Sequence, residues 1–200
     1  DPVGFLDADQ GKIGTFIHGL PVLGTTAEVA EIAIRKLAKR ALITIANAAG
    51  PEIRRITLSN RSLRPRHLEL TSYIELAMAA HRVDRLHPAF NKLFIQTEAN
   101  EGQRSLLASR RPRDPDEPPI YMAHRITLPG DTSPFVYATD RNAFIGRGRT
   151  LRDPQAVRGE LGNTAGFVLD PILSLRKTVR LAAGERVQIS LVLGAAKTRE

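Results

Sequence analysis

The stretch IRRITLSNRSLRPRHLELTSYIEL (residues 53–76), followed by HPAFNKLFIQTE (residues 87–98), decides the fold class of this chain. Its first part holds two apolar, β-branched runs, 53–58 and 68–76, on either side of a polar loop that contains Asn60. This pattern predicts an antiparallel hairpin. In the second run apolar and polar residues alternate, which predicts one face in a core and one face in solvent.

The rest of the chain repeats this pattern of short apolar or alternating runs. Further strands are expected at 92–97, 106–109, 120–128, 135–139, 167–169, 173–181 and 187–193. Ala183 and Gly184 are expected to form the turn of a last hairpin. The segment RRPRDPDEPP at 110–119 is expected to be an exposed loop because its prolines prevent regular structure. Many short strands at this spacing predict an all-β dominated fold, an antiparallel β-sandwich.

Residues 1–50 form a divergent N-terminal segment in this interpretation, and residues 51–200 form the sandwich domain. Thr25 and Glu28 make a capping-box signature, and apolar residues follow at helical spacing. One amphipathic helix is therefore expected over about 26–41. Short strands within 13–17 and at 42–45 and a turn at 47–50 are also expected.

The core of the sandwich is predicted from the inward positions of the strands. These side chains are expected to be buried: Ile56, Leu58, Leu70, Ile74, Phe94, Val187, Ile189 and Leu191. His124 alternates with apolar residues and is expected at a sheet surface.

Composition excludes several kinds of site. The chain has no cysteine, so disulfides, thiolate catalysis and cysteine-ligated metals are excluded. Its five histidines lack the paired spacing of metal ligands, so no metal site is expected. No apolar run approaches the length of a membrane-spanning helix, which predicts a soluble chain without direct membrane insertion. The chain begins without methionine and is expected to be part of a longer protein.

The formal charge of +8, from 29 basic and 21 acidic residues, comes mainly from arginine. Arginine suits phosphate and carboxylate, so nucleic acid is one candidate partner. Basic nucleic-acid surfaces are normally interleaved with stacking aromatic residues, and this chain has seven Phe, three Tyr and no Trp. The basic residues are better explained as solvated faces of strands.

Five sequence blocks in one order carry a resemblance to a known family. They are RRITLSNRSLRPRHLELTSYIEL, HPAFNKLFIQTE, LLASRRPRDPDEPP, FIGRGRTLRDPQAV and GFVLDPILSLRKTVRL. Over residues 52–200 the chain resembles the amino-terminal β-domain of the phosphorylase-like module of cyclic β-1,2-glucan synthases, in the cellobiose-phosphorylase family, glycoside hydrolase family 94. The resemblance implies a supersandwich fold.

The resemblance also implies what this domain does. In family members the general acid and the phosphate ligands lie in a helical barrel, which no part of this chain resembles, so the chain alone is expected to be inactive, with no catalytic residue and no cofactor. The implied larger enzyme is a glycosyltransferase and inverting β-glucoside phosphorylase with inorganic phosphate as co-substrate. The implied partners are β-glucan, the catalytic barrel of the same chain and a homodimer mate. The implied location is the cytoplasmic side of the bacterial inner membrane.

Two groups of residues are candidates for the rim of a sugar site or for a domain interface. The first is the polar and aromatic set His87, Phe90, Lys92 and Glu98. Phe90 can stack on a sugar face, while Lys92 or Glu98 bonds hydroxyls. The alternative is that these residues serve the fold itself.

The second group is Arg147 and Arg149 in the motif GRGR. Glycines let backbone amides approach an anion, but no helix pattern follows to complete a nucleotide site. A bulged strand with a loop that docks on a neighbouring domain is the preferred interpretation.

Two other functions remain open. A stand-alone carbohydrate-binding module has the predicted fold, although such modules usually present Trp or Tyr platforms. A basic nucleic-acid-binding domain is the second alternative. The neighbouring carboxylates Asp114, Asp116 and Glu117 resemble a glycosidase pair only in composition, because a proline-rich loop is poor support for catalytic groups. They are expected to be solvated.

Overall fold

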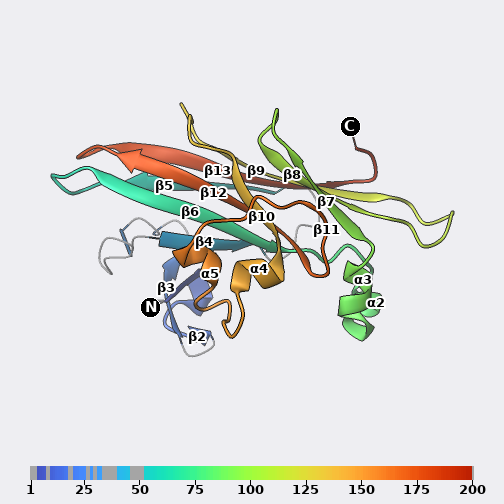
Figure 1. Cartoon of the computed structure of the whole chain (residues 1–200). Coiled ribbons are helices and arrows are strands. Elements are labelled where there is room, and N and C mark those ends of the chain that lie inside the picture. The colour runs from blue at the N-terminus through green and yellow to red at the C-terminus, as the bar shows by residue number, and fades with distance from the viewer. Residues whose placement is uncertain are drawn as a thin grey trace.

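Two β-sheets stacked face to face make up most of the molecule (Figure 1). The structure is a computed structural model that describes residues 4–7, 10–17, 20–25, 28, 31–32, 40–45 and 52–199. The two stacked sheets confirm the expected β-sandwich, and a few short helices lie beside it.

The upper layer in Figure 1 is a six-stranded sheet in which all pairs of neighbouring strands are antiparallel. Its order is β11-β7-β8-β9-β13-β5. The strands are β5 (Glu52–Ser59), β7 (Ile95–Asn100), β8 (Ser105–Arg110), β9 (Ile120–Thr127), β11 (Gly166–Phe167) and β13 (Arg186–Ala196).

The second layer is a four-stranded sheet in the order β10-β12-β6-β4. Its strands are β4 (Arg40–Ile45), β6 (Arg66–Glu75), β10 (Val136–Asp140) and β12 (Pro171–Leu181). The expected strand at 42–45 is confirmed as β4. It pairs with β6 in parallel, so this part of the N-terminal segment forms one edge of the sandwich.

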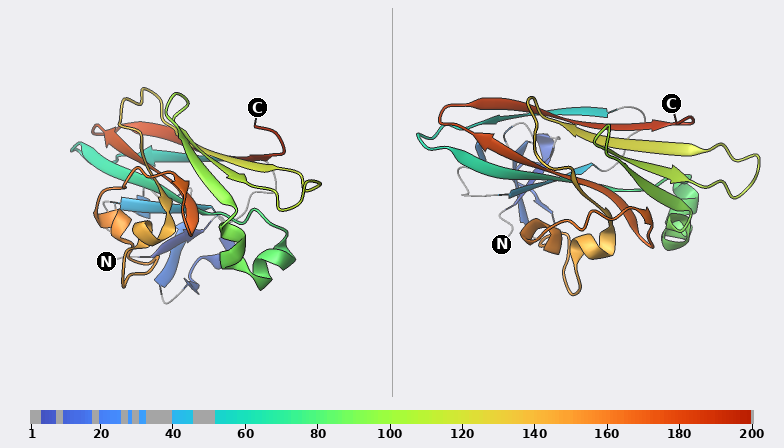
Figure 2. Two further views of the ribbon diagram at one scale, coloured as in Figure 1. Left: turned by 45° about the vertical axis from the view of Figure 1, so that its right-hand side comes forward. Right: turned by 45° about the horizontal axis from the view of Figure 1, so that its top comes forward.

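Short helices cover the outer side of the four-stranded sheet and one end of the sandwich (Figure 2). They are α2 (His81–Leu86), α3 (Pro88–Lys92), α4 (Arg141–Ile145) and α5 (Gln155–Arg158). Asp140 begins α4, because its Oδ1 accepts hydrogen bonds from Asn142 N at 2.8 Å and Ala143 N at 3.4 Å. Gly146 ends the helix with a φ of 85°, a conformation that glycine adopts without strain.

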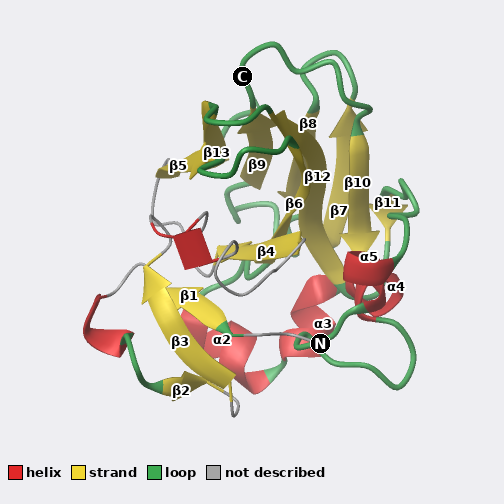
Figure 3. Ribbon diagram, turned by 90° about the vertical axis from the view of Figure 1, so that its left-hand side faces the viewer, coloured by secondary structure: helices red, strands yellow, loops and turns green. Residues whose placement is uncertain are grey.

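The N-terminal residues add a small sheet beside the sandwich (Figure 3). Its elements are β1 (Phe5–Asp7), η1 (Gln10–Lys12), β2 (Phe16–Ile17) and β3 (Leu20–Thr25). The strand expected within 13–17 is shorter than predicted, because Ile13 and Gly14 lie in a turn.

The predicted capping box is present in part, since Glu28 Oε2 accepts from the backbone N of Thr25 at 2.7 Å. Glu31 and Ile32 are helical, while most of the predicted helix over 26–41 lies outside the described residues, as does the turn expected at 47–50. The predicted end of the helix is wrong, because Arg40 already pairs in β4, where β6 offers a ladder of hydrogen bonds.

The main core lies between the two sheets. Of the predicted core residues, Leu70, Ile74, Ile189 and Leu191 are at most 3% exposed, and Ile56 and Leu58 are 4% exposed. Val187 is partly buried against this core. Phe94 is only half-buried and packs against Phe90 instead.

A second cluster forms between the four-stranded sheet and α4–α5. It consists of Tyr73, Ala138, Phe144, Ala156, Leu161 and Ile172. Thr71 and Tyr73 are therefore buried, although their alternation predicted a solvent face for β6. Because helices cover this sheet, both faces of its central strands are buried.

Both predicted hairpins are wrong in the same way. β5 and β6 belong to different sheets, and so do β12 and β13. Each pair is an arch that crosses from one layer to the other, at the left of Figure 1. Strand sequences do not encode this difference, because an apolar face can be buried either beside its neighbour in one sheet or opposite it across the core.

Asn60, 2% exposed, holds the two arches together. Its backbone N donates to Glu185 O at 2.8 Å and its backbone O accepts from Gly184 N at 2.9 Å. Its side-chain Nδ2 donates to Leu181 O at 3.2 Å and to Ala182 O at 2.8 Å. We call residues 59–66 with 181–186 the arch end. The polar loop that predicted a hairpin turn thus joins the two arches through one buried residue, Asn60, while Leu63 at its tip is exposed.

His124 is fully buried, so its expected place at a sheet surface is wrong. Its Nδ1 donates to Val192 O at 3.0 Å, and its Nε2 accepts from Ser72 Oγ at 2.8 Å. A carbonyl can only accept, which assigns the proton to Nδ1. Burial lowers the pKa of His124 to about 4, so the ring is neutral at pH 7.

Candidate interaction surface

Asp170 joins the α2–α3 region to α4. One oxygen of its carboxylate forms an ion pair with Lys92 Nζ at the end of α3, and the other accepts from Arg141 Nη1 at 3.2 Å. The Arg141 backbone N also donates to Asp170 O at 2.9 Å. Lys92 and Arg141 are both largely shielded from solvent, so their ion pairs with Asp170 hold the two helical segments in place relative to each other.

Arg141 extends the same network to the end of β6. Its Nε donates to Tyr73 Oη at 2.9 Å and to Glu75 Oε1 at 3.1 Å, while Tyr73 Oη donates to Glu75 Oε1 at 2.7 Å. Burial and the neighbouring Glu75 raise the pKa of the Tyr73 phenol above its ordinary value. The tyrosine therefore stays neutral and its ring, 5.1 Å from that of Phe144, stays in the second cluster.

Arginine and phenylalanine side chains stack next to α3. The rings of Phe90 and Phe94 meet edge to face with centroids 5.3 Å apart. The guanidinium of Arg113 lies over both rings, at 5.8 and 5.7 Å, and that of Arg111 lies 5.9 Å from the Phe94 centroid. Each exposed cation–π contact contributes an interaction free energy of about 0.5–1 kcal/mol, so the contacts help to order these side chains.

Asn91 ties α3 to α2. It is 2% exposed, and its Nδ2 donates to Val83 O at 2.9 Å and His87 O at 3.0 Å. Pro88 is preorganised for the first turn of α3, so His87-Pro88 separates the two helices.

Large apolar side chains are exposed on these same elements. Among the described residues, six of the ten exposed large apolar side chains come from 83–93 and 167–169, with Leu169 at 75% and Phe167 at 71%. They are Val83, Leu86, Phe90, Leu93, Phe167 and Leu169. β11 pairs with β7 directly after α3, which brings the two groups to one end of the sandwich. We call residues 81–93, 141–158 and 166–170 the helical surface.

The structure places the first candidate group on and beside this surface. His87 is exposed between α2 and α3, and Phe90 is 52% exposed, with Arg113 over its ring. Lys92 is partly buried by its ion pair with Asp170. Glu98 lies farther along β7 and binds Arg199 at 2.7 and 2.8 Å.

The second candidate group lies on the loop after α4. Arg147 is exposed, and Arg149 forms an ion pair with Asp153 at 2.8 Å. Gly146 and Gly148 have positive φ, so the motif is a turn and not part of a strand. In the part of the chain that the structure describes, Lys92 and α4 meet through Asp170, while no hydrogen bond or ion pair joins Glu98, Arg147 or Arg149 to His87, Phe90 or Lys92.

The loop at 110–119 differs from its prediction. Arg110, the last residue of β8, is 5% exposed and pairs with Glu117. The Arg113 backbone N and then the Arg110 guanidinium lower the pKa of Glu117 below its ordinary value. Glu117 is thus the counterion of a buried arginine, whereas Asp114 and Asp116 are exposed as expected.

Sequence reasoning did not single out Tyr73, Glu75, Arg141 or Asp170. They come from three separate segments, the end of β6, the start of α4 and the residue before β12, and only folding brings them together. The one available signal was that Tyr73, Glu75 and Asp170 all lie within the blocks that carried the family resemblance.

Among the described residues, the structure contains no cluster of three His, Asp or Glu side chains suited to a metal ion. No helix in the described ranges is long and apolar enough to cross a membrane.

The chain is similar to known proteins in two comparisons. The family model "Glycosyl hydrolase 94, supersandwich domain" matches residues 29–200. The protein named "Cyclic beta-(1,2)-glucan synthase NdvB" from Rhizobium meliloti (strain 1021) is 38% identical over 159 residues, which are 78% of this chain and 6% of that protein. The chain therefore spans a small part of this relative. The match to the family model over most of the chain shows that the chain belongs to the glycosyl hydrolase 94 supersandwich domain family.

Proposed function

We propose that this chain is the non-catalytic β-domain of a larger carbohydrate-active enzyme, a glycosyltransferase with phosphorylase character, and that its helical surface docks on the catalytic barrel. The observation that carries the proposal is the group of exposed apolar side chains on α2, α3 and β11. Exposed apolar groups that gather at one place, with arginine around them, are typical of protein interfaces.

The ordered networks at this surface support docking. Asp170 links Lys92 to Arg141, and Asn91 links α3 to α2, so the apolar side chains are carried on a preorganised base. A preorganised surface loses less conformational freedom on binding. Exposed Phe90 and Leu86 can therefore act as anchors in pockets of a partner domain.

The rim of a sugar site is the second part of the proposal. His87, Phe90, Lys92 and Glu98, with Arg147 and Arg149, are proposed to border the site once the barrel is in place. Lys92 would act through its position at the Asp170 junction, and Phe90 through the part of its ring that Arg113 leaves exposed.

The relative's name supports a proposal for the substrate: a relative called a cyclic β-(1,2)-glucan synthase favours β-1,2-glucan as the carbohydrate of the whole enzyme. Inorganic phosphate is the proposed co-substrate, as the resemblance to glycoside phosphorylases implies. A second copy of the chain is the other proposed partner. The cytoplasmic side of the bacterial inner membrane is the proposed location.

Assembly with the separately expressed remainder of the enzyme tests the docking surface. Leu86→Ser with Phe90→Ser, and Arg147→Ala with Arg149→Ala, are expected to weaken assembly at least tenfold in analytical ultracentrifugation. Leu63→Ser is the matched control, because Leu63 is 97% exposed and lies at the arch end. If both double variants assemble like the unchanged chain, the helical surface is not the interface.

Activity and DNA binding test the remaining parts. The purified chain is expected to release no glucose 1-phosphate from β-1,2-glucan with phosphate present, and turnover that survives further purification would overturn the non-catalytic assignment. DNA binding is expected to be weak, nonspecific and strongly salt-dependent. Tight, sequence-dependent binding that disappears in the Arg147 and Arg149 double variant would favour a nucleic-acid-binding domain instead.

A further inference from the structure

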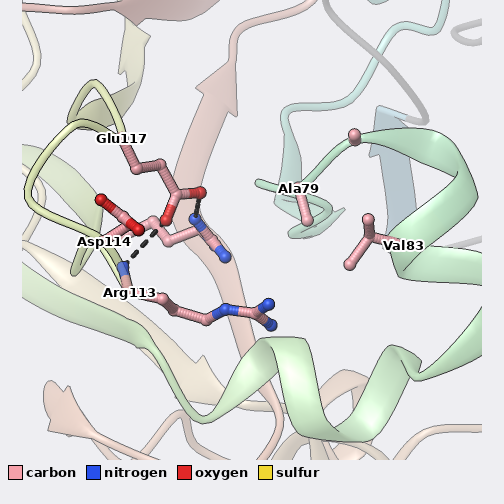
Figure 4. A pocket seen from close by; sticks show the side chains of 7 residues that line it. Ala79, Val83, Arg113, Asp114 and Glu117 are labelled. Carbon is pink, nitrogen blue, oxygen red and sulfur yellow. Dashed lines mark hydrogen bonds and ion pairs between the residues drawn. The ribbon is translucent and has the colours of Figure 1, made fainter.

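A cavity of about 410 Å³ lies between α2 and the loop that follows β8. This volume falls within the range of about 300–1,000 Å³ that is typical of small-molecule sites. Its lining residues are Ala79, Ala80, Val83, Arg110, Arg113, Asp114 and Glu117. Figure 4 shows the Arg113 side chain extending between the loop and α2, with Ala79 and Val83 on the opposite wall. None of the candidate rim residues lines this cavity.

Arg110 has hydrogen-bonding capacity that the described residues do not use. It is 5% exposed, and the structure gives an acceptor only to its Nη1, which donates to Glu117 Oε1. Its Nε is a buried donor without a partner among the described residues. A guanidinium carries five N–H donors, and unpaired buried donors cost free energy. Arg110 lines the cavity, and its Nη2, which has no hydrogen-bond partner among the described residues and is not fully buried, can donate to a ligand there.

The charges of the lining select the kind of ligand. The lining contains two guanidinium groups, those of Arg110 and Arg113, and two carboxylates, those of Asp114 and Glu117, so it carries no net charge. An anion would be attracted by the arginines but repelled by the carboxylates, and a cation would meet the opposite conflict. A neutral ligand whose groups both donate and accept fits all four side chains.

Hydroxyl groups meet this requirement, because each donates one hydrogen bond and accepts two. A sugar also has apolar C–H faces, and the Ala79, Ala80 and Val83 side of the cavity offers an apolar wall for one of them. Glu117 stays ionised, since the Arg113 backbone N and the Arg110 guanidinium lower its pKa, and it therefore remains an acceptor.

We propose that this cavity is a carbohydrate subsite, which binds one end of a neutral gluco-oligosaccharide between the arginines and carboxylates of the 110–119 loop and the apolar side of α2. The choice of β-1,2-linked glucose units as the ligand rests on the proposed function. The site shares Val83 with the helical surface, and Arg113 both lines the cavity and stacks on Phe90. It would hold glucan on the β-domain outside the catalytic barrel.

An NMR titration of this chain with short β-1,2-linked gluco-oligosaccharides tests the subsite. The Nε–H signals of Arg110 and Arg113 and the backbone signals of Ala79, Ala80 and Val83 are expected to shift in a saturable manner. Inorganic phosphate is expected not to compete. Unchanged arginine signals at the highest soluble sugar concentration would overturn the proposal, and so would displacement of the sugar by phosphate.

Two variants probe the cavity by independent means. Asp114→Asn removes one acceptor charge, and Ala80→Phe fills space at a position that precedes α2 with an extended backbone. Each is expected to weaken sugar binding at least tenfold. Asp116→Asn is the matched control, since it makes the same change in the same loop but does not line the cavity. Equal binding by all three variants would contradict the assignment.

Two results separate this inference from the proposed function. Ala80→Phe is expected to leave assembly with the catalytic part unchanged, while the variant of Leu86 and Phe90 is expected to leave the Arg110 Nε–H shift unchanged. Assembly without sugar binding would refute the subsite alone. Sugar binding without assembly would refute the docking surface alone.

Discussion

The arch end and the helical surface use polar groups in opposite ways. At the arch end Asn60 donates and accepts within the chain, and its side chain is buried. At the helical surface the polar groups also pair, yet Leu86, Phe90 and Phe167 remain more than half exposed. The arch end exposes a single large apolar side chain, Leu63, and its buried polar group stabilises the fold. The helical surface orders its polar groups but exposes several large apolar side chains together, which is typical of a surface that binds a partner.

The largest effect is expected where a buried charge loses its partner. Lys177 on β12 is 1% exposed, and its Nζ lies 2.5 Å from Asp131 Oδ2. Burial alone would raise the pKa of Asp131, but hydrogen bonds from Lys177 and Ser133 lower it below the ordinary value. Asp131→Ala is therefore expected to lower the free energy of unfolding by about 3–5 kcal/mol in urea titrations.

Adding Lys177→Met to Asp131→Ala supplies the control for this change. The double variant is expected to recover most of the loss, because it removes the uncompensated charge and keeps a side chain of similar length. Equal instability of the single and double variants would show that the ion pair is not the cause.

The main core gives the next largest effect. Leu70 lies between the sheets and is 3% exposed, so Leu70→Ala is expected to lower the free energy of unfolding by about 2–5 kcal/mol. The exposed Leu63 at the arch end is the matched control, and Leu63→Ala is expected to change stability by at most about 0.5 kcal/mol. Similar urea midpoints for the two variants would contradict the sandwich core.

The next largest effect on the free energy of unfolding is expected from protonation of the buried His124. The pKa of His124 is about 4 in the fold and about 6.5 when unfolded, so protons bind the unfolded chain more tightly. Its contribution is complete above about pH 6.5 and is lost as the pH falls toward 4, up to about 3 kcal/mol. Unfolding measured from pH 7 to pH 4 is expected to show this slope.

Two histidine variants identify the group that titrates. His124→Asn is expected to flatten the slope between pH 6.5 and 4, whereas His67→Gln changes an exposed residue and is expected to preserve it. A slope that persists without His124 would assign the effect to other groups.

The smallest effect on stability is expected at the helical surface. Phe167 is 71% exposed on β11, so Phe167→Ser is expected to change the free energy of unfolding by at most about 0.5 kcal/mol. The same variant is expected to weaken assembly with the catalytic part. A stability loss above about 2 kcal/mol, measured in urea, would show that this side chain belongs to the fold and would remove the contrast between the two regions.

The sequence predicted only those parts of the candidate site that lie within a single segment of the chain. The block around Phe90 and Lys92 was found because aromatic and polar residues gather in it, and the structure does bring it to an exposed surface. Asp170 was not found, because a lone Asp before a proline carries no signal until Lys92 and Arg141 meet it from other elements.

Patterns within single segments were enough to predict most strands, the sandwich class and most of the apolar positions in the core, because alternation and β-branching act within one segment. The pairing of the strands depends on the packing of the whole chain. β5 and β6 are joined by a short polar loop, yet they lie in opposite sheets because β13 and β12 are their hydrogen-bonding partners.

Contacts between distant segments also explain why Thr71 and His124 are buried. Local patterns report how polar a residue is. What covers it depends on segments far away in the chain, such as α4 and α5 over β6, so burial of these polar groups is decided when distant elements pack together.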